Sequence, residues 1–346
     1  MNRRHFLQTT TGAATVLSSR VAAQPGATRP LVNAYYLRAH LYTMVPRHVR
    51  EDLRWMADHG TNAVSVAVLE QDLKAAVENI ALIGEEAEKL GLALYAVPSR
   101  WGGLLAGAPK VPSLFSVLNP QTWMLDARGK PYQSDTSGVI SSVHSPETFE
   151  FFCRSVDEMA RLWPIRGIVW DEPKQLGAKD FSPLALKNVP ADAPTAAHVR
   201  AKTEFFSRVN AHVRRHHPKL TTSLFIYANS GAEVTNLAAQ ITDLDYFGCD
   251  GRPWAERLGG QMESQGKSLV DQGRRFVEVA KANGKKSLFL IENHNLPARD
   301  IDLMNRGLPE VLALKPDQLA YYYYPRNIGD PERNMATIAR HLRTFK

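Results

Sequence analysis

The chain has 346 residues, with 42 Lys and Arg against 35 Asp and Glu, and a formal net charge of +7. This excess is mild and scattered, without the clustered basic and aromatic residues of a nucleic-acid groove, so nucleic acid is not an expected partner. No run of about eighteen apolar residues occurs, so no membrane span is expected. Two cysteines, Cys153 and Cys249, are too few for a disulfide framework or a cysteine-based zinc site.

The N-terminal segment has the pattern of an export signal. Residues Asn2–Gln8 (NRRHFLQ) resemble the twin-arginine motif, a weakly apolar stretch follows, and Arg20–Ala23 (RVAA) suits cleavage near Gln24. We expect residues 1–23 to be a signal peptide read by the twin-arginine export machinery and residues 24–30 to be a short linker. Loss of the three arginines in this signal leaves 39 basic against 35 acidic residues, a net charge of +4. The mature protein is therefore expected in the periplasm or outside the cell.

From residue 31 onward, strand-like segments alternate with helix-like segments. The expected strands are Leu31–Tyr36, Asn62–Leu69, Leu92–Val97, Gly167–Trp170, Thr221–Tyr227, Asp245–Gly248, Ser287–Ile291 and Gln318–Tyr323. The expected helices are Val49–His59, Leu73–Leu90, Ser145–Trp163, Thr195–His216, Ala232–Gln240, Leu269–Asn283, Ile301–Ala313 and Pro331–Thr344. Eight strand–helix units predict an α/β fold, a single (β/α)8 TIM barrel over residues 31–346. A doubly wound open sheet is the rival, but it seldom carries eight regular units without a second domain.

Two connections that follow strands are unusually long, Arg100–His144 and Pro173–Pro194. Loops that follow barrel strands gather on the catalytic face, and long ones tend to be lids or substrate walls. The first loop carries Trp101 and Trp123, and such aromatic residues can form flat platforms for sugar rings. For any one of them, packing within the loop is the alternative.

The segment Arg166–Lys174 (RGIVWDEPK) is the strongest functional signal in the chain. It reads as a short buried strand that runs into Asp171 and Glu172 and ends at Pro173, which has no N–H to donate to a sheet. Ligands bind at the carboxyl ends of strands in α/β folds, so both carboxylates are candidates for catalysis. The alternative is an acidic turn that caps a following helix.

The other strands deliver polar and aromatic residues to the same rim. Together with Glu292 they suggest a sugar-binding cleft with carboxylates at its base. The candidate substrate-binding residues are Arg38, His40, Arg100, Trp101, Trp170, Tyr227, Asn229, Asp250, Arg252, His294, Tyr324 and Arg326.

Glycosidic cleavage needs two carboxyl groups with different protonation. One carboxylate stabilises or attacks the oxocarbenium-like centre, and the other holds a proton for the leaving group. A neighbouring negative charge raises the pKa of a carboxyl group. One member of the Asp171–Glu172 pair is therefore a candidate for the residue that must keep a proton. Motifs for metal binding, a serine nucleophile or a phosphate loop are missing from the sequence, so no metal or cofactor is expected.

The stretch Gly167–Pro173 (GIVWDEP) resembles the strand-four motif of the retaining barrel glycosidases that include cellulases and β-mannanases. This resemblance implies that Glu172 is the acid/base, that Glu292 is the nucleophile, and that Arg38 supports the nucleophile. It departs from the family at Asp171, where the family has asparagine. The two glutamates should then face each other across the barrel mouth, about 5–5.5 Å apart for retention or about 6.5–9.5 Å apart for inversion.

Three alternatives remain. Residues Leu125–Pro131 (LDARGKP) and the strand ending at Asp171 also resemble α-amylase and α-galactosidase barrels, which implies Asp171 as nucleophile with Asp250 or Glu292 as acid. The adjacent Asp-Glu pair resembles that of N-acetylhexosaminidases, which implies Glu172 as acid and Asp171 as the residue that orients the substrate acetamide. The third is a secreted barrel that binds a glycan without cleaving it. All of these make a carbohydrate the expected partner.

Overall fold

The computed structural model describes residues 29–37, 44–107, 109–262 and 265–345. The predicted signal peptide, Arg38 and His40 lie outside the described residues. Eight parallel strands form a closed barrel in the order β1-β10-β9-β8-β7-β6-β3-β2. The first and last strands pair directly, with Leu31 opposite Gln318, so the sheet has no free edge. The predicted (β/α)8 barrel is confirmed.

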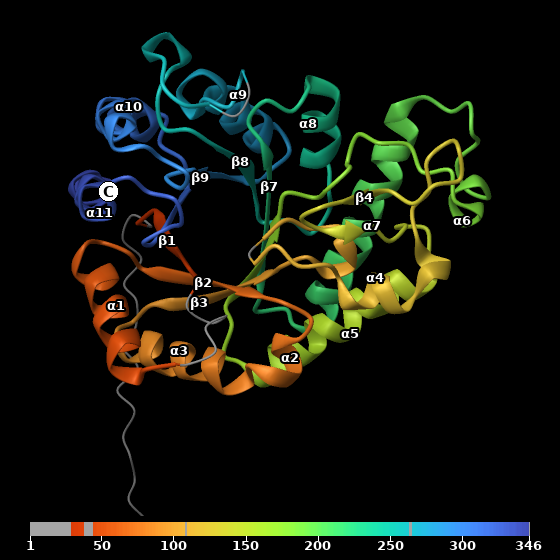
Figure 1. Ribbon diagram of the computed structural model, residues 1–346, viewed down its shortest axis with the longest axis horizontal. Coiled ribbons are helices and arrows are strands. Elements are labelled where there is room, and N and C mark those ends of the chain that lie inside the picture. Colours follow the sequence, from red (N-terminus) through yellow and green to blue (C-terminus); the bar gives the residue numbers. More distant parts are fainter. Residues whose placement is uncertain (1–28, 38–43, 108, 263–264, 346) are drawn as a thin grey trace, which may run out of the picture.

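The helices form a ring around the strands (Figure 1). The barrel strands are β1 (Leu31–Tyr36), β2 (Ala63–Val68), β3 (Ala93–Pro98), β6 (Gly167–Asp171), β7 (Thr221–Tyr227), β8 (Tyr246–Gly251), β9 (Lys286–Ile291) and β10 (Gln318–Tyr322). The helices are α1 (Pro46–Asp58), α2 (Asp72–Ala75), α3 (Val77–Lys89), α4 (Leu114–Leu118), α5 (Pro146–Leu162), α6 (Pro183–Leu186), α7 (Thr195–His216), α8 (Ala232–Ala239), α9 (Leu269–Ala282), α10 (Ile301–Ala313) and α11 (Pro331–Leu342). A small hairpin joins β4 (Gln133–Ser134) to β5 (Gly138–Val139).

Side chains on each barrel strand alternate between two buried cores. In β6, Val169 belongs to the small core inside the barrel, whereas Ile168 and Trp170 belong to the larger core between strands and helices. Because successive side chains on a strand point to opposite faces, Asp171 shares the inward direction of Val169. The alternation therefore aims a carboxylate into the barrel mouth and its tryptophan neighbour away from it.

Two elements differ from their expected bounds. The helix expected at Leu73–Leu90 is broken at Ala76, whose φ of −133° ends α2 before α3 begins. The strand expected to end at Gly248 continues to Gly251, because β8 keeps pairing with β9 as far as Ile291. This extension brings Asp250 into the strand with its side chain directed inward.

The two long loops pack against each other on one side of the barrel, the right side in Figure 1. The buried carboxylate of Asp180 accepts a hydrogen bond of 2.6 Å from Ser142 Oγ, and Phe181 N donates to Leu125 O at 2.9 Å. Within the described ranges, none of the helices is both long and apolar enough to cross a bilayer.

Candidate active site

The end of β6 brings two successive side chains into one pocket. Both Asp171 and Glu172 line it, although strict alternation would direct Glu172 outward. Glu172 has a φ of +37°, in the left-handed region that non-glycine residues seldom adopt, and this turn redirects its side chain. Two backbone hydrogen bonds tie the long loop to this turn, Ala106 N to Asp171 O at 2.8 Å and Lys174 N to Leu104 O at 2.7 Å.

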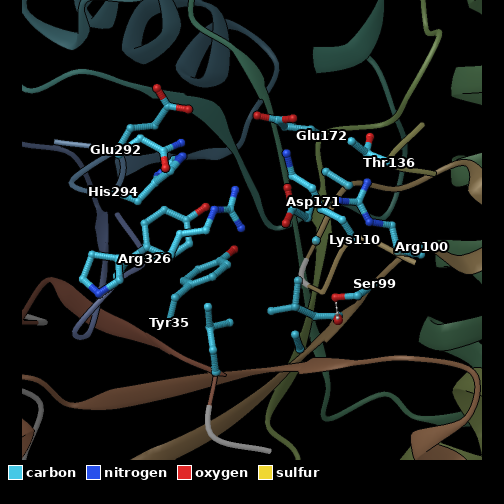
Figure 2. Close-up of a pocket in the computed structure, with 18 of the residues that line it drawn as sticks. Tyr35, Ser99, Arg100, Lys110, Thr136, Asp171, Glu172, Glu292, His294 and Arg326 are labelled. Atoms are coloured by element: carbon cyan, nitrogen blue, oxygen red, sulfur yellow. Dashed lines mark hydrogen bonds between the residues drawn. The ribbon is translucent and has the colours of Figure 1, made fainter. Parts of the chain in front are cut away.

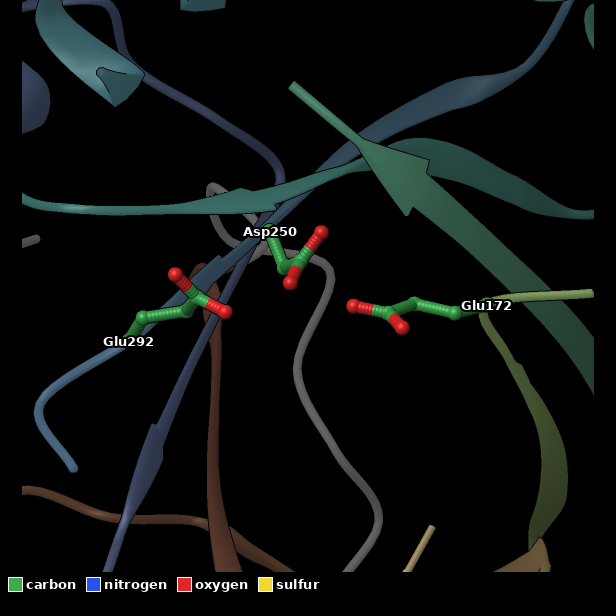
Figure 3. A group of neighbouring side chains, drawn as sticks. All are labelled: Glu172, Asp250 and Glu292. Atoms are coloured by element: carbon green, nitrogen blue, oxygen red, sulfur yellow. The ribbon is translucent and has the colours of Figure 1, made fainter. Parts of the chain in front are cut away.

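Three carboxylates from three elements converge above the barrel floor. Glu172 follows β6, Asp250 lies in β8 and Glu292 follows β9, and one oxygen of each lies within 4.8 Å of the other two. Glu172 and Glu292 approach from opposite sides, with Asp250 between them (Figure 3). All three are at most 8% exposed, so their charges are poorly screened by solvent.

Each glutamate has a lysine partner. Lys174 Nζ lies 2.5 Å from Glu172 Oε2 and donates to Tyr227 Oη at 2.8 Å. Lys267 Nζ lies 3.0 Å from Glu292 Oε1 and 4.7 Å from the centre of the Tyr227 ring. The lysine charges therefore compensate both buried glutamates, and Tyr227 lies against both lysines.

Arg252 holds Glu292 from behind. Its Nη1 donates to the backbone oxygens of Glu292 at 2.7 Å and of His294 at 2.6 Å, and its Nε lies 3.8 Å from Glu292 Oε2. The arginine is fully buried, so it orients the carboxylate without facing the pocket. We predicted Arg252 as a substrate-binding residue, and its geometry is that of a positioning residue.

The protonation pattern among the carboxyls differs from the sequence-based expectation. Burial, followed by the charge of Glu172, raises the pKa of Asp171 to about 7. The same two causes hold the pKa of Asp250 well above its usual value. Burial also raises the pKa of Glu172, but the hydrogen bond with Asp250 and the charge of Lys174 outweigh it, so the net pKa is lowered. The expected raised pKa within the Asp171–Glu172 pair therefore lies on Asp171 and not on Glu172, because Asp250 and the cation beside Glu172 favour the ionised form of Glu172.

The pocket over these carboxylates has a volume of about 220 Å³. Tyr35, His294 and Arg326 lie on the side of Glu292, and Arg100 and Lys110 lie on the side of Asp171 and Glu172 (Figure 2). Tyr227, Lys267 and Tyr322 also line it. Of the predicted site residues that the structure describes, it brings together Arg100, Asp171, Glu172, Tyr227, Glu292, His294 and Arg326, with Asp250 and Arg252 buried beside Glu292.

Besides the buried Asp250 and Arg252, four other predicted substrate-binding residues do not line this pocket. Trp170 is fully buried on the outer face of β6, where its indole N–H donates to Asn210 Oδ1 at 2.9 Å. Trp101 is also fully buried and donates to Val68 O at 2.9 Å, so neither tryptophan can stack on a sugar. The predictions for these two residues are wrong, because their rings fill the core between strands and helices.

Tyr324 and Asn229 are also displaced. The β10 strand ends at Tyr322, and the next inward position, Tyr324, has a φ of +42° and donates to Glu332 at 2.7 Å. Asn229 is exposed beyond the pocket rim. Tyr322 lines the pocket in place of Tyr324, because the tyrosine run at 321–324 leaves the strand one inward position earlier than we expected.

Sequence reasoning missed both lysines. Lys174 lies two residues after Glu172, so the same motif could have indicated it. Lys267 precedes Ser268, which caps α9 by accepting a hydrogen bond from Asp271 N, and nothing in that loop sequence indicates a pocket residue.

The three carboxylates are spaced closely enough to hold a divalent cation. However, Lys174 and Lys267 already lie on one oxygen of each glutamate, so a cation would have to compete with two positive charges. The arrangement favours carboxylates compensated by lysines over a metal centre.

No protein-family model matches the sequence, and the search of curated proteins finds no match. Similar solved structures include a β-galactosidase from the Antarctic haloarchaeon Halorubrum lacusprofundi, at 13% identity and a TM-score of 0.62, which covers 91% of this chain and 58% of the other. An endo-1,4-β-mannanase from Rhizomucor miehei has 10% identity and a TM-score of 0.60, with 93% of this chain and 96% of the other covered. A GH5_18 protein from Streptomyces cattleya, solved with GlcNAc, has 14% identity and a TM-score of 0.58, covering 93% and 82%. The chain therefore spans less than two thirds of the β-galactosidase, and at these identities the likeness shows the shared barrel fold.

Proposed function

We propose that the protein is a glycoside hydrolase in which Glu292 is the nucleophile and Glu172 the acid/base. The observation that carries this proposal is the approach of two buried glutamates from opposite sides of the barrel mouth, each with its own lysine. Two carboxyl groups bracketing a small pocket are what glycosidic cleavage requires. The names of the structural neighbours, a β-galactosidase and a mannanase among them, support the same class.

The catalytic proton is held by the hydrogen-bonded pair of Glu172 and Asp250. Two carboxyl groups in hydrogen-bond contact share one proton, because both cannot be ionised at short range. Burial and the charge of Glu172 raise the pKa of Asp250, which favours keeping that proton on the pair. Glu172 lines the pocket and Asp250 lies behind it, so Glu172 is the member that can reach a glycosidic oxygen.

In the first step, Glu172 gives the pair's proton to the glycosidic oxygen as the bond from that oxygen to the anomeric carbon breaks. The Glu292 carboxylate forms a bond to the same carbon, with Lys267 and Arg252 holding it in place. In the second step, water attacks the anomeric carbon, its proton returns to the Glu172–Asp250 pair, and the bond to Glu292 breaks. The closest oxygens lie within 4.8 Å, which supports the shorter separation of retaining enzymes.

An Asp171 nucleophile fits the electrostatics less well. A nucleophilic carboxylate must be ionised, whereas burial raises the pKa of Asp171 to about 7. Glu292, in contrast, forms ion pairs with Lys267 and Arg252, which fix the position of its side chain at the pocket.

The test is a screen of the protein on nitrophenyl glycosides and polysaccharides, with wild type, Glu172→Gln and Glu292→Gln compared in one assay. Each substitution should lower kcat by about 10²–10⁴-fold or more on any substrate that the wild type cleaves. Glu310→Gln is the matched control, since Glu310 is a solvent-accessible partner of Arg257 and should leave activity unchanged. Full activity of Glu172→Gln on every substrate would rule out its role as acid.

Azide separates the roles of the two glutamates. With Glu292→Ala and an activated substrate, azide should restore turnover and give a glycosyl azide inverted at the anomeric carbon. Rescue of Asp171→Ala in place of Glu292→Ala would favour the amylase-like mechanism. Binding of glycans without turnover of any substrate would favour a glycan-binding barrel.

We also propose that the protein is exported through the twin-arginine route, on the strength of the NRRHFLQ segment. Replacing Arg3 and Arg4 together by lysine should move the protein from the periplasmic to the cytoplasmic fraction of expressing bacteria. An unchanged distribution would contradict this route.

A further inference from the structure

The pocket carries more positive than negative charge. Among the described residues that line it, the acids are Asp171, Glu172 and Glu292, and the Lys and Arg side chains are Arg100, Lys110, Lys174, Lys267 and Arg326. Lys174 and Lys267 are matched one to one by Glu172 and Glu292. The pocket therefore contains three further positive side chains that take no part in these two ion pairs: Arg100, Lys110 and Arg326.

These three cations lack carboxylate partners within the described part of the chain. Arg100 donates to neutral groups, Ser137 Oγ at 2.9 Å and Pro109 O at 3.3 Å. Lys110 and Arg326 are exposed at the mouth, and neither forms an ion pair with a described residue. Arg326 reaches in from the side of Tyr35 and His294, opposite Arg100 and Lys110 (Figure 2).

Arg100 is a built feature of the site. It is 5% exposed and has a φ of +64°, in the left-handed region, where a non-glycine residue is strained. The loop that follows Arg100 packs closely against the end of β3 at Gly107. A Cβ atom added to this glycine would lie only 2.3 Å from Ser99 Oγ. A buried guanidinium whose hydrogen-bond partners are neutral is costly to keep charged, and this one lines the pocket with its positive charge.

We propose that the sugar bound in this pocket carries an anionic substituent, a carboxylate as in a uronic acid or a sulfate ester, between Arg100, Lys110 and Arg326. Guanidinium groups donate paired N–H bonds to such oxyanions, and the burial of Arg100 strengthens its share of them. This inference rests on the proposed glycoside hydrolase function and names its substrate class.

Neutralising Asp171 does not account for the extra cations. Burial and the charge of Glu172 raise the pKa of Asp171 to about 7 against the charges of Lys174 and Arg100, which disfavours the ionised form that would pair with Arg100. Burial lowers the pKa of Arg100, the charges of Asp171 and Glu172 act against this, and repulsion from Arg326 lowers the pKa further. A neutral sugar would leave that repulsion in place, whereas an anion relieves it.

The experiment measures binding, so that it does not depend on turnover. Isothermal titration of the wild-type protein is carried out with D-glucuronate, D-galacturonate and N-acetylglucosamine 6-sulfate, each against its neutral parent sugar. At least one acidic sugar should bind about tenfold or more tightly than its parent, and added salt should reduce that preference. The uronates and the sulfated sugar distinguish the two sources of the anion.

Arg326→Gln and Lys110→Gln are the test variants, because both side chains are exposed and their replacement spares the fold. Each should remove most of the preference for the acidic sugar, because binding of the acidic sugar should weaken by a larger factor than binding of its neutral parent. Arg306→Gln, an exposed arginine on α10, is the matched control and should bind as the wild type does. Arg100→Gln should have the largest effect, with its folding checked by circular dichroism.

The outcomes for ligand class and for catalysis are separate. The inference is overturned if acidic and neutral sugars bind equally well. It is also overturned if the preference for acidic sugars survives in a variant that combines Arg326→Gln and Lys110→Gln. Both conclusions hold even if neutral glycosides are hydrolysed. Binding of acidic sugars that depends on Arg326, without hydrolysis of any glycoside, upholds the anionic ligand and overturns the proposed hydrolase function.

Discussion

Replacing Asp171 by asparagine should stabilise the barrel at pH 8 and destabilise it by about 1–3 kcal/mol at pH 4. The folded-state pKa of Asp171 is about 7 and its ordinary value is 3.8, because burial and the charge of Glu172 disfavour the ionised form. Between these two values the folded protein holds a proton that the unfolded chain has released. Its free energy of unfolding therefore falls as the pH rises from about 4 to about 7, and then levels off.

The size of the effect follows from the pKa difference. A difference of about three units corresponds to about 4 kcal/mol at 1.36 kcal/mol per unit. The buried amide of asparagine must also lose its hydration, which costs about 1–3 kcal/mol. The net gain for Asp171→Asn should therefore be about 1–3 kcal/mol at pH 8, whereas at pH 4 only the cost of burying the amide remains.

The same variant separates the catalytic alternatives. Asparagine at this position recreates the Asn-Glu-Pro triplet of the glycosidase clan that the motif resembles. If Glu292 is the nucleophile, Asp171→Asn should keep measurable turnover, whereas an Asp171 nucleophile would make the variant inactive. Stability is measured by urea denaturation at pH 4 and pH 8, followed by tryptophan fluorescence, with exposed Asp192→Asn as the control. An equal stability change at both pH values would refute the electrostatic reasoning.

Three further predictions concern neighbouring features. Lys174→Met should raise the pKa of Glu172 and move the alkaline limb of the kcat/KM profile upward by about 1–3 pH units, because burial then acts on Glu172 without that cation; an unmoved limb would argue against Glu172 in the acid pair. Trp170→Ala should cost about 3–5 kcal/mol in urea denaturation and leave KM for a hydrolysed glycoside unchanged, since the ring lies in the outer core. Treatment with EDTA should not reduce turnover, because Lys174 and Lys267 already compensate the glutamates; loss of activity restored by Ca²⁺ or Mg²⁺ would indicate a metal centre.

The fold and the inward position of the main carboxylates could be predicted because they depend on local patterns. The alternation of strand-like and helix-like segments predicts the eight units. Side chains on a strand alternate between its two faces, so Glu292 points inward like Leu290, and Asp171 points inward like Val169. The same rule, applied to Trp170, excludes it from the pocket, since neighbours on a strand point to opposite faces. The prediction for Trp170 is wrong because a motif on a strand does not present all of its residues to the same face.

The electrostatics could not be predicted, because they depend on residues that meet only in the folded chain. Because Asp171 and Glu172 are adjacent, one of them is expected to have a raised pKa. Adjacency alone does not indicate which one. Lys174 and Asp250, from the following turn and from β8, settle it in favour of Asp171. Lys267 comes from a loop without periodicity, and its place beside Glu292 results from the pairing of Arg252 with Ser268.

Backbone strain connects the motif with the pocket. A regular strand can direct only alternate side chains inward, so β6 alone could deliver Asp171 or Glu172, but not both. The left-handed turn at Glu172 removes that restriction, and Arg100 after β3 and Asn295 after β9 line the same pocket with φ values of +64° and +46°. Each such position costs on the order of 1–3 kcal/mol and persists only where the surrounding structure holds it. The barrel thus gives up some stability to present more charged groups than its strands alone could, and this places Glu172 and Asp250 opposite Glu292 with its lysine partner.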